Sequence, residues 1–184
     1  MNTAFVRSLL VALAVALPVA LPSQAFAASK AELNASSKRA LDKLVASVPA
    51  AAAMKSRAVA ILVFPSITKA GFMIGGQYGD GVLWQGGKPV AYYNTSGASY
   101  GLQAGAQKYG YAMFFMKKKA LDALNSAEGF EVGVGPSVVV VDQGMGKSMT
   151  TNTMNDDCYA FIFSQSGLMA GIGIQGNKIT KLKK

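Results

Sequence analysis

The sharpest pattern of chemistry-bearing residues in this chain is a glycine motif near its C-terminus. Gly171, Gly173 and Gly176 match the dinucleotide-binding pattern G-x-G-x-x-G. That pattern requires a following helix, whose N-terminus holds the pyrophosphate, and an acidic residue about 20 positions further on. The residues after Gly176 are Asn-Lys-Ile-Thr-Lys-Leu-Lys-Lys and supply neither. We therefore predict a glycine-rich β-strand over residues 168–175 and no nucleotide site.

A second glycine motif, Gly144-Met-Gly-Lys-Ser148, resembles the end of a phosphate-binding P-loop. The full pattern G-x-x-x-x-G-K-[ST] requires glycine where Val141 stands, and a helix after the final serine. No helix-forming sequence follows Ser148. We predict that residues 143–157 form a polar loop.

Side chains for nucleophilic, acid–base or metal chemistry are scarce. The chain has no histidine, a single cysteine and nine acidic residues, of which only Asp156 and Asp157 are adjacent. Ser-His and Cys-His catalysis and histidine metal sites are thereby excluded. Cys158 stands in an apolar run, so we interpret it as a buried side chain. We expect no enzyme, no metal and no cofactor; a hydrolase that uses scattered carboxylates or a serine is the catalytic alternative.

Basic side chains are the more abundant candidates. Lysine and arginine number 18 against nine acidic residues, which gives a net charge of +9. Such an excess favours a polyanionic partner, and each Lys or Arg near an anionic membrane contributes about 1 kcal/mol. The alternative for each basic cluster is an ordinary solvated surface. The candidate lipid-binding residues are Lys38, Arg39, Lys43, Lys55, Arg57 and Lys69.

The first 27 residues have the three parts of a secretory signal peptide. Arg7 gives the positive start, residues 8–21 are almost continuously apolar, and Ala25-Phe-Ala27 is a small-x-small cleavage site. A transmembrane anchor is the weaker interpretation, because the run is short and Pro22 ends it. We predict export to the periplasm or envelope, a mature single domain over residues 28–184, and no nucleic-acid partner.

Two helices are expected at the start of the mature chain. Ser29-Lys-Ala-Glu32 is a capping-box pattern, and the helix should run to about Val48, before Pro49. Its apolar residues share one stripe and its basic residues the opposite side, which is typical of a surface helix packed on its domain or of a membrane-contacting helix. A second short helix follows Pro49. The apolar stripe comprises Leu33, Leu41, Leu44, Val45 and Val48.

From residue 58 the sequence is typical of short β-strands. We predict a buried strand over residues 58–64 that Pro65 ends, tight turns at Gly79-Asp-Gly81 and Gly86-Gly87, and a short helix over residues 117–124. Glycines that recur on one strand face mark sharp bends or close approaches of two backbones. The fold class is therefore α+β, an antiparallel glycine-rich barrel or sandwich. Further strands are expected at 71–78, 82–84, 90–93, 99–106, 109–116, 130–135, 137–141, 158–163 and 168–175.

The order of these motifs resembles the SYLF lipid-binding domain, also described as an actin-binding domain in yeast proteins. The resemblance spans roughly Leu41 to Lys181 and is specific through the order and spacing of its pieces. They are Val48-Pro49 to Lys55 with the strand 58–64, Lys69-Ala-Gly-Phe72 with Gly79-Asp-Gly-Val82, Gly101-Leu-Gln-Ala-Gly105, Lys119-Ala-Leu-Asp-Ala-Leu124, and Tyr159–Ser164 with Gly167-Leu-Met-Ala-Gly171 and Gly176.

The resemblance implies non-catalytic binding of phosphoinositides or other anionic phospholipids through a basic N-terminal region. Carried to this chain, it favours Lys55 and Arg57, with Lys38, Arg39 and Lys43 on the preceding helix. The sequence departs from the family pattern where a Gly-Pro is replaced by Gly144-Met-Gly146, and where an arginine is replaced by Trp84-Gln-Gly86. The alternative is a structural protein of the envelope that binds another protein or a glycan.

Overall fold

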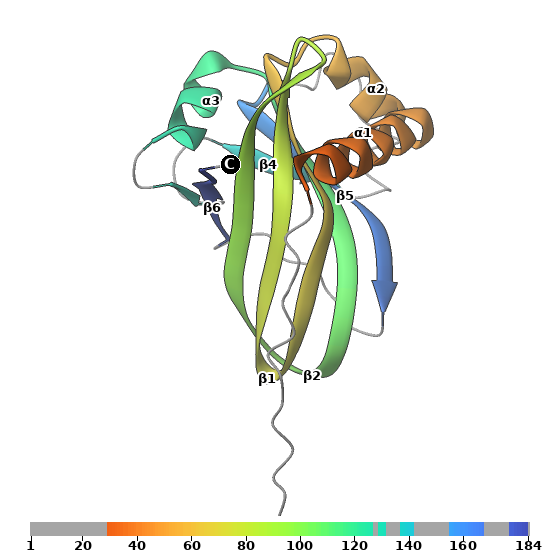
Figure 1. The fold of residues 1–184 in the computed structure, drawn as a ribbon, viewed down its shortest axis with the longest axis vertical. Coiled ribbons are helices and arrows are strands. Elements are labelled where there is room, and N and C mark those ends of the chain that lie inside the picture. The colour runs from red at the N-terminus through yellow and green to blue at the C-terminus, as the bar shows by residue number, and fades with distance from the viewer. Residues whose placement is uncertain (1–28, 127–128, 132–136, 142–154, 168–176, 184) are drawn as a thin grey trace, which may run out of the picture.

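The structure, a computed structural model, describes residues 29–126, 129–131, 137–141, 155–167 and 177–183. Three helices accompany a strongly curled sheet, which confirms the α+β, barrel-like fold class (Figure 1). Within the described residues, no helix is both long and apolar enough to cross a membrane. The elements are α1 (Lys30–Ser47), α2 (Pro49–Lys55), β1 (Ala60–Gln85), β2 (Lys88–Phe115), α3 (Lys118–Leu124), β3 (Phe130–Glu131), β4 (Val138–Val141), β5 (Cys158–Gly167) and β6 (Lys178–Lys181).

One long hairpin, β1 and β2, forms the centre of the sheet. The two strands pair antiparallel from Ala60 with Phe115 to Gln85 with Lys88. The turn at Gly86-Gly87 is confirmed, because both glycines have a positive φ, 54° and 76°, as the favoured two-residue hairpin turns require. Several of the predicted short strands are therefore continuous parts of β1 or β2.

The predicted turn at Gly79-Asp-Gly81 is wrong, since Asp80 lies inside β1 and pairs with Asn94. These glycines serve close packing instead. A Cβ on Gly79 would lie 2.8 Å from the backbone oxygen of Ser66, and one on Gly81 would lie 2.6 Å from the ring of Phe64. The two halves of β1 thus approach each other so closely that only glycine fits at these positions.

The prediction that Pro65 ends the first strand is also wrong. β1 continues past it, with a register shift between Phe64 and Ile67. Proline has no backbone N–H to donate, so an irregularity of the ladder is where a strand tolerates it. A second shift follows Gly71, which pairs with Gly105, itself at a φ of 148°. This is where the hairpin bends, as the glycine pattern predicted.

The remaining strands add to the two halves of β2. The first half pairs with β6, which pairs with β3, and the second half pairs with β5. The pairs are antiparallel as predicted, except that β4 lies parallel to β5. This exception corrects the all-antiparallel expectation.

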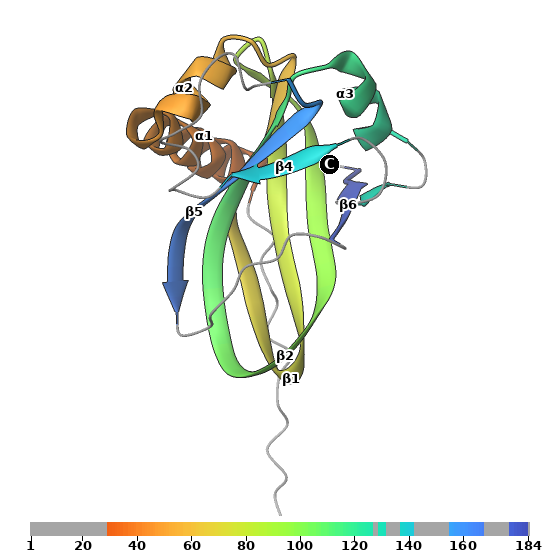
Figure 2. The same cartoon turned by 180° about the vertical axis from the view of Figure 1, so that it is seen from behind.

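Where the helices cover it, the sheet is buried on both faces. Alternate side chains of a strand point to opposite faces of the sheet. One set forms a core with α3 on one face, and the other set forms a core with α1 and α2 on the other face (Figures 1 and 2). In β1, Leu62 and Phe64 belong to the first core and Val63 to the second, and all three are fully buried. This two-sided burial explains the continuous apolar run at residues 58–64, which predicted a buried strand correctly.

Some predictions fall on residues outside those described. They include the signal peptide over residues 1–27, the P-loop-like motif Gly144–Ser148 and the closing glycine strand 168–175. The predicted helix 117–124 is confirmed as α3, and the helix from Ser29 is confirmed as α1.

Candidate functional site

Helix α1 is fixed in place by its ends and by its apolar stripe. The hydroxyl of Ser29 accepts a hydrogen bond from the backbone N–H of Glu32 at 3.2 Å, and the Glu32 carboxylate accepts one from the Ser29 N–H at 3.0 Å. The predicted capping box is therefore present. Leu33, Leu41 and Leu44 are buried against the sheet. The apolar stripe of this amphipathic helix is therefore packed on the domain, and its charged side is exposed.

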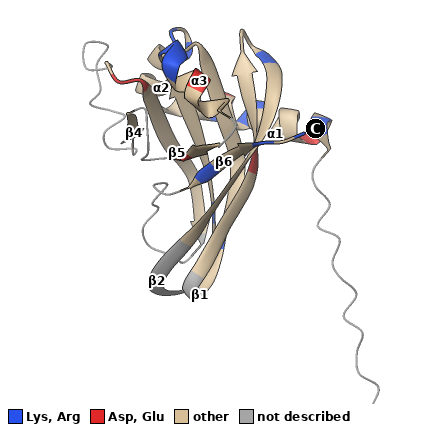
Figure 3. Cartoon of the chain, turned by 90° about the vertical axis from the view of Figure 1, so that its left-hand side faces the viewer, with Lys and Arg blue, Asp and Glu red and all other residues tan. Residues whose placement is uncertain are grey.

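Exposed cations lie on the opposite side of α1, at the end of α2 and just after it. We call them the basic layer: Lys38, Arg39, Lys43, Lys55 and Arg57. The structure thus brings five of the six candidate residues to the same end of the molecule. Within the part of the chain that the structure describes, Arg39, Lys43 and Arg57 make no ion pair. Figure 3 shows basic residues on α1, and separately on α3 and β6.

The other two cations of the basic layer share one carboxylate. The Lys38 ammonium lies 2.7 Å from one Asp42 oxygen, and the Lys55 ammonium lies 3.7 Å from the other. Asp42 therefore joins α1 to α2. The hydrogen bond from Lys38 is the main cause that holds the pKa of Asp42 below its usual range. All three side chains are about half exposed or more, so solvent screens the pair and its contribution to stability is small.

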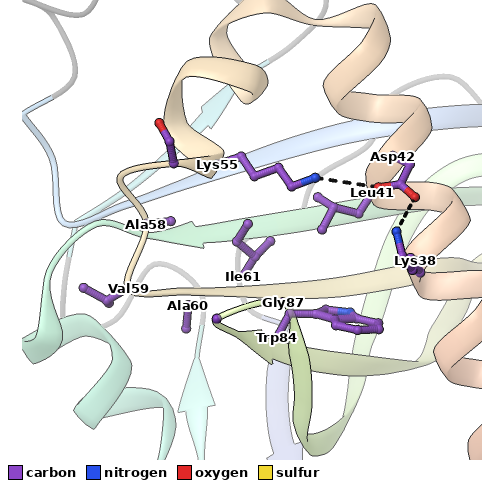
Figure 4. Close-up of a pocket in the computed structure, with 12 residues that line it drawn as sticks. Lys38, Leu41, Asp42, Lys55, Ala58, Val59, Ala60, Ile61, Trp84 and Gly87 are labelled. Carbon is purple, nitrogen blue, oxygen red and sulfur yellow. Dashed lines mark hydrogen bonds and ion pairs between the residues drawn. The ribbon is translucent and has the colours of Figure 1, made fainter.

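A cavity of about 280 Å³ opens beside this triad (Figure 4). Its walls come from α1, from the segment between α2 and β1, and from the end of β1 at the hairpin turn. Leu41, Ile61 and Trp84 give it apolar walls and are each at most 9% exposed, whereas Val59 is 41% exposed. The lining residues are Lys38, Leu41, Asp42, Lys55, Ser56, Ala58, Val59, Ala60, Ile61, Trp84, Gly86 and Gly87.

The sixth candidate residue, Lys69, is not part of this arrangement. It lies in β1 opposite Gln107, nine positions beyond the start of the strand and next to the bend at Gly71. At about 3.3 Å per residue, a strand covers roughly 30 Å over that distance. Lys69 is half-buried there. The structure therefore separates it from the basic layer.

The lysine triplet at the start of α3, Lys117–Lys119, has acidic partners. Lys117 and Lys119 contact the two oxygens of Asp157 at 3.0 and 2.7 Å, and the Asp157 side chain is only 8% exposed. The hydrogen bond from Lys119, followed by that from Lys117, lowers the pKa of Asp157. Lys118 pairs with Asp122 at 2.7 Å on the surface. This cluster fastens α3 to the start of β5.

Cys158 and the described carboxylates Asp80 and Asp157, which a hydrolase could use, are buried or held by neighbouring side chains. Cys158 is fully buried, as predicted, and burial raises its pKa. Asp80 accepts a hydrogen bond from Asn94 at 3.0 Å, and Asp157 is held by two lysines. Asp142 lies outside the described residues. Among the described side chains, no group of three or more His, Cys, Asp or Glu is arranged to hold a metal ion.

Part of the chain matches a known protein family. Residues 96–184 match the model of the Ysc84 family, described as "Las17-binding protein actin regulator". The match over residues 96–184 is consistent with a SYLF-family domain. This family is one of binding domains associated with actin and with lipids. No curated protein sequence matches the chain.

The matched segment begins within β2, so the basic layer and the cavity precede it in sequence. They are joined to the SYLF-family segment through the hairpin, because β1 pairs with β2 along almost its whole length. Sequence reasoning missed Asp42 as the partner of Lys38 and Lys55, and Trp84 as part of the cavity beside them. The spacing of Lys38 and Asp42, four apart in a helix, could have indicated the first. No sequence pattern near Trp84 indicated its place in the cavity, since Trp84 reaches α1 only through the curl of the sheet.

Proposed function

We propose that this chain is a non-catalytic protein that binds anionic phospholipids at a membrane surface of the bacterial envelope, with the basic layer as its contact. The lipid association of the SYLF family supports the ligand class. The signal-peptide pattern of residues 1–27 supports the compartment. Phosphoinositide-like headgroups are the lipid class that the resemblance to the family implies.

One observation carries the proposal: Arg39, Lys43 and Arg57 are exposed and have no acidic partner among the described residues. Cations that already hold a carboxylate, as Lys117 and Lys119 do, must give it up to bind phosphate. The three unpaired cations do not have this competing interaction. At about 1 kcal/mol for each cation near an anionic surface, they supply a weak and reversible attraction of about 3 kcal/mol.

The contact is made by headgroups and not by inserted side chains. Leu33, Leu41 and Leu44, which could have entered the acyl region, are buried against the sheet. Binding that depends on exposed charges is screened by salt, with a Debye length of about 8 Å at physiological ionic strength. We therefore expect binding to vesicles that is strong at low salt and lost at high salt.

Flotation of the purified protein with vesicles tests the proposal. Protein should float with vesicles that contain phosphatidylglycerol or phosphatidylinositol phosphate, and not with pure phosphatidylcholine. The double variant Arg39→Glu, Lys43→Glu should lose flotation. The control Lys178→Glu, Lys181→Glu changes the net charge equally at two exposed residues of β6 and should retain most of it. Absence of flotation at low salt with every anionic vesicle would reject the proposal.

A protein partner is the second candidate, and the description of the matched family, which names a Las17-binding actin regulator, favours it. In that case the exposed cations would contact an acidic protein or a glycan of the envelope. Capture of one stoichiometric partner from an envelope extract, unchanged by added anionic vesicles, would support this candidate over the lipid.

A further inference from the structure

The cavity beside the basic layer combines two features of sites that bind a small ligand, namely apolar walls and a few polar groups. Its walls are apolar, formed by Leu41, Ile61 and Trp84, while its mouth holds two ammonium groups and one carboxylate (Figure 4). The three charged groups sum to +1. Ligand sites are mostly apolar with a few placed polar groups, and they range from about 300 to 1,000 Å³. At about 280 Å³, this cavity suits one slender chain and not the two chains of a phospholipid.

The two lysines are not equally engaged. Lys38 donates a hydrogen bond to Asp42 at 2.7 Å, the usual length for a charged pair, whereas Lys55 stands 3.7 Å from that carboxylate. An anion that enters the cavity can therefore bind Lys55 at little cost in existing contacts. Asp42 is the group that competes with it, because the carboxylate lines the same cavity as both lysines.

We infer that this cavity binds a single-chain anionic amphiphile, such as a fatty acid or a monoacyl phosphate. Its anionic group binds Lys55 and Lys38 in competition with Asp42, and its hydrocarbon chain lies on Leu41, Ile61 and Trp84. The half-exposed Val59 extends the apolar wall toward solvent. The inference rests on the proposed function in taking anionic lipid as the ligand class, but of the basic layer it uses Lys38 and Lys55 and not Arg39, Lys43 or Arg57.

Trp84 is the single tryptophan of the chain and lines the cavity, so its fluorescence can report ligand binding there. Titration of the purified protein with decanoate, below the concentration at which it forms micelles, should change the tryptophan emission saturably. Decanol tests the chain without the charge, and inorganic phosphate tests the charge without the chain. Both should bind at least about ten-fold more weakly than decanoate, because each lacks one of the two contacts.

Three neutralising variants separate the cavity from general electrostatics. Asp42→Asn removes the competing carboxylate and should tighten decanoate binding about three-fold. Asp122→Asn changes the net charge equally, in the other lysine–aspartate pair that spans one helical turn, and should leave binding unchanged. Lys55→Gln should weaken binding about ten-fold.

The outcomes distinguish this inference from the proposed function. The Arg39→Glu, Lys43→Glu variant should lose vesicle flotation and keep its affinity for decanoate. Equal affinity for decanol and decanoate, equal effects of Asp42→Asn and Asp122→Asn, or no saturable change in emission would each overturn the cavity assignment. Flotation that persists in those cases would leave the surface contact with vesicles in place.

Discussion

The indole N–H of Trp84 donates a hydrogen bond to the hydroxyl of Ser37 at 2.8 Å. The two residues are 47 positions apart, both are buried, and the bond ties α1 to the end of β1. Ser37 is fully buried within an otherwise apolar side of the helix, so the bond explains a polar residue in the apolar stripe. It also sets where the indole stands in the wall of the cavity.

The substitution Ser37→Ala should destabilise the protein by about 1–3 kcal/mol, because it leaves a buried N–H without an acceptor. Urea unfolding followed by circular dichroism measures this. Ser47→Ala, in the same helix but at an exposed hydroxyl, is the control and should change stability by less than about 0.5 kcal/mol. Equal effects of the two substitutions would show that helix propensity, and not the buried bond, is responsible.

Asp157 should make the fold sensitive to acid. Its pKa lies below the ordinary value of 3.8 because Lys119 and Lys117 hold the charged form. A lowered pKa in the folded state means that the carboxylate stabilises the fold above that ordinary value, and that this stabilisation is lost as the pH falls below it.

Asp157→Asn should therefore be less stable than the parent at neutral pH, and the difference should shrink as the pH falls below 3.8. Thermal unfolding measured over a pH series checks this. Asp122→Asn removes an exposed pair instead and should have little effect at any pH. A constant difference between parent and Asp157→Asn across the series would contradict the ion-pair explanation.

Cys158 should be unreactive in the native protein. The thiol is fully buried and its pKa is raised, so little thiolate forms and reagents have no access to it. Ellman's reagent at mildly alkaline pH should release no colour from native protein and one equivalent after unfolding in guanidinium, since the chain has one cysteine. Rapid labelling of the folded protein would show that β5 opens at its start.

Gly81→Ala should destabilise the fold by about 1–3 kcal/mol through overpacking. The added Cβ would lie 2.6 Å from the ring of Phe64, which is fully buried and has no space to move. Gly76→Ala is the matched control in the same strand, because its Cβ would have no neighbour nearer than 3.9 Å. A comparison of the two unfolding free energies measures the packing cost, and equal changes in the two variants would contradict the overpacking explanation.

Local patterns predicted the helices and the nature of the strands, because the interactions that form them are close in sequence. The Ser29–Glu32 capping box lies within one turn of helix, and Gly86-Gly87 carries the positive φ angles that a hairpin turn needs. The errors arose where contacts between segments far apart in sequence determine the local structure. Pro65 failed to end a strand because a long partner, β2, continues the pairing beyond it. Gly79 and Gly81 suggested a turn, yet the packing of Ser66 and Phe64 against them accounts for both.

For the candidate site too, some features follow from the sequence and others only from the tertiary structure. The sequence by itself determined that the chain is basic, lacks histidine and places cations along one side of a helix, since composition and helical periodicity require no partner. Only the tertiary structure decided that Lys69 lies apart from the other candidates, that Lys117 and Lys119 are engaged by Asp157, and that Trp84 stands beside Lys38. These relationships depend on how one hairpin bends at its glycines, and a bend that joins residues tens of positions apart is fixed by packing across the whole sheet.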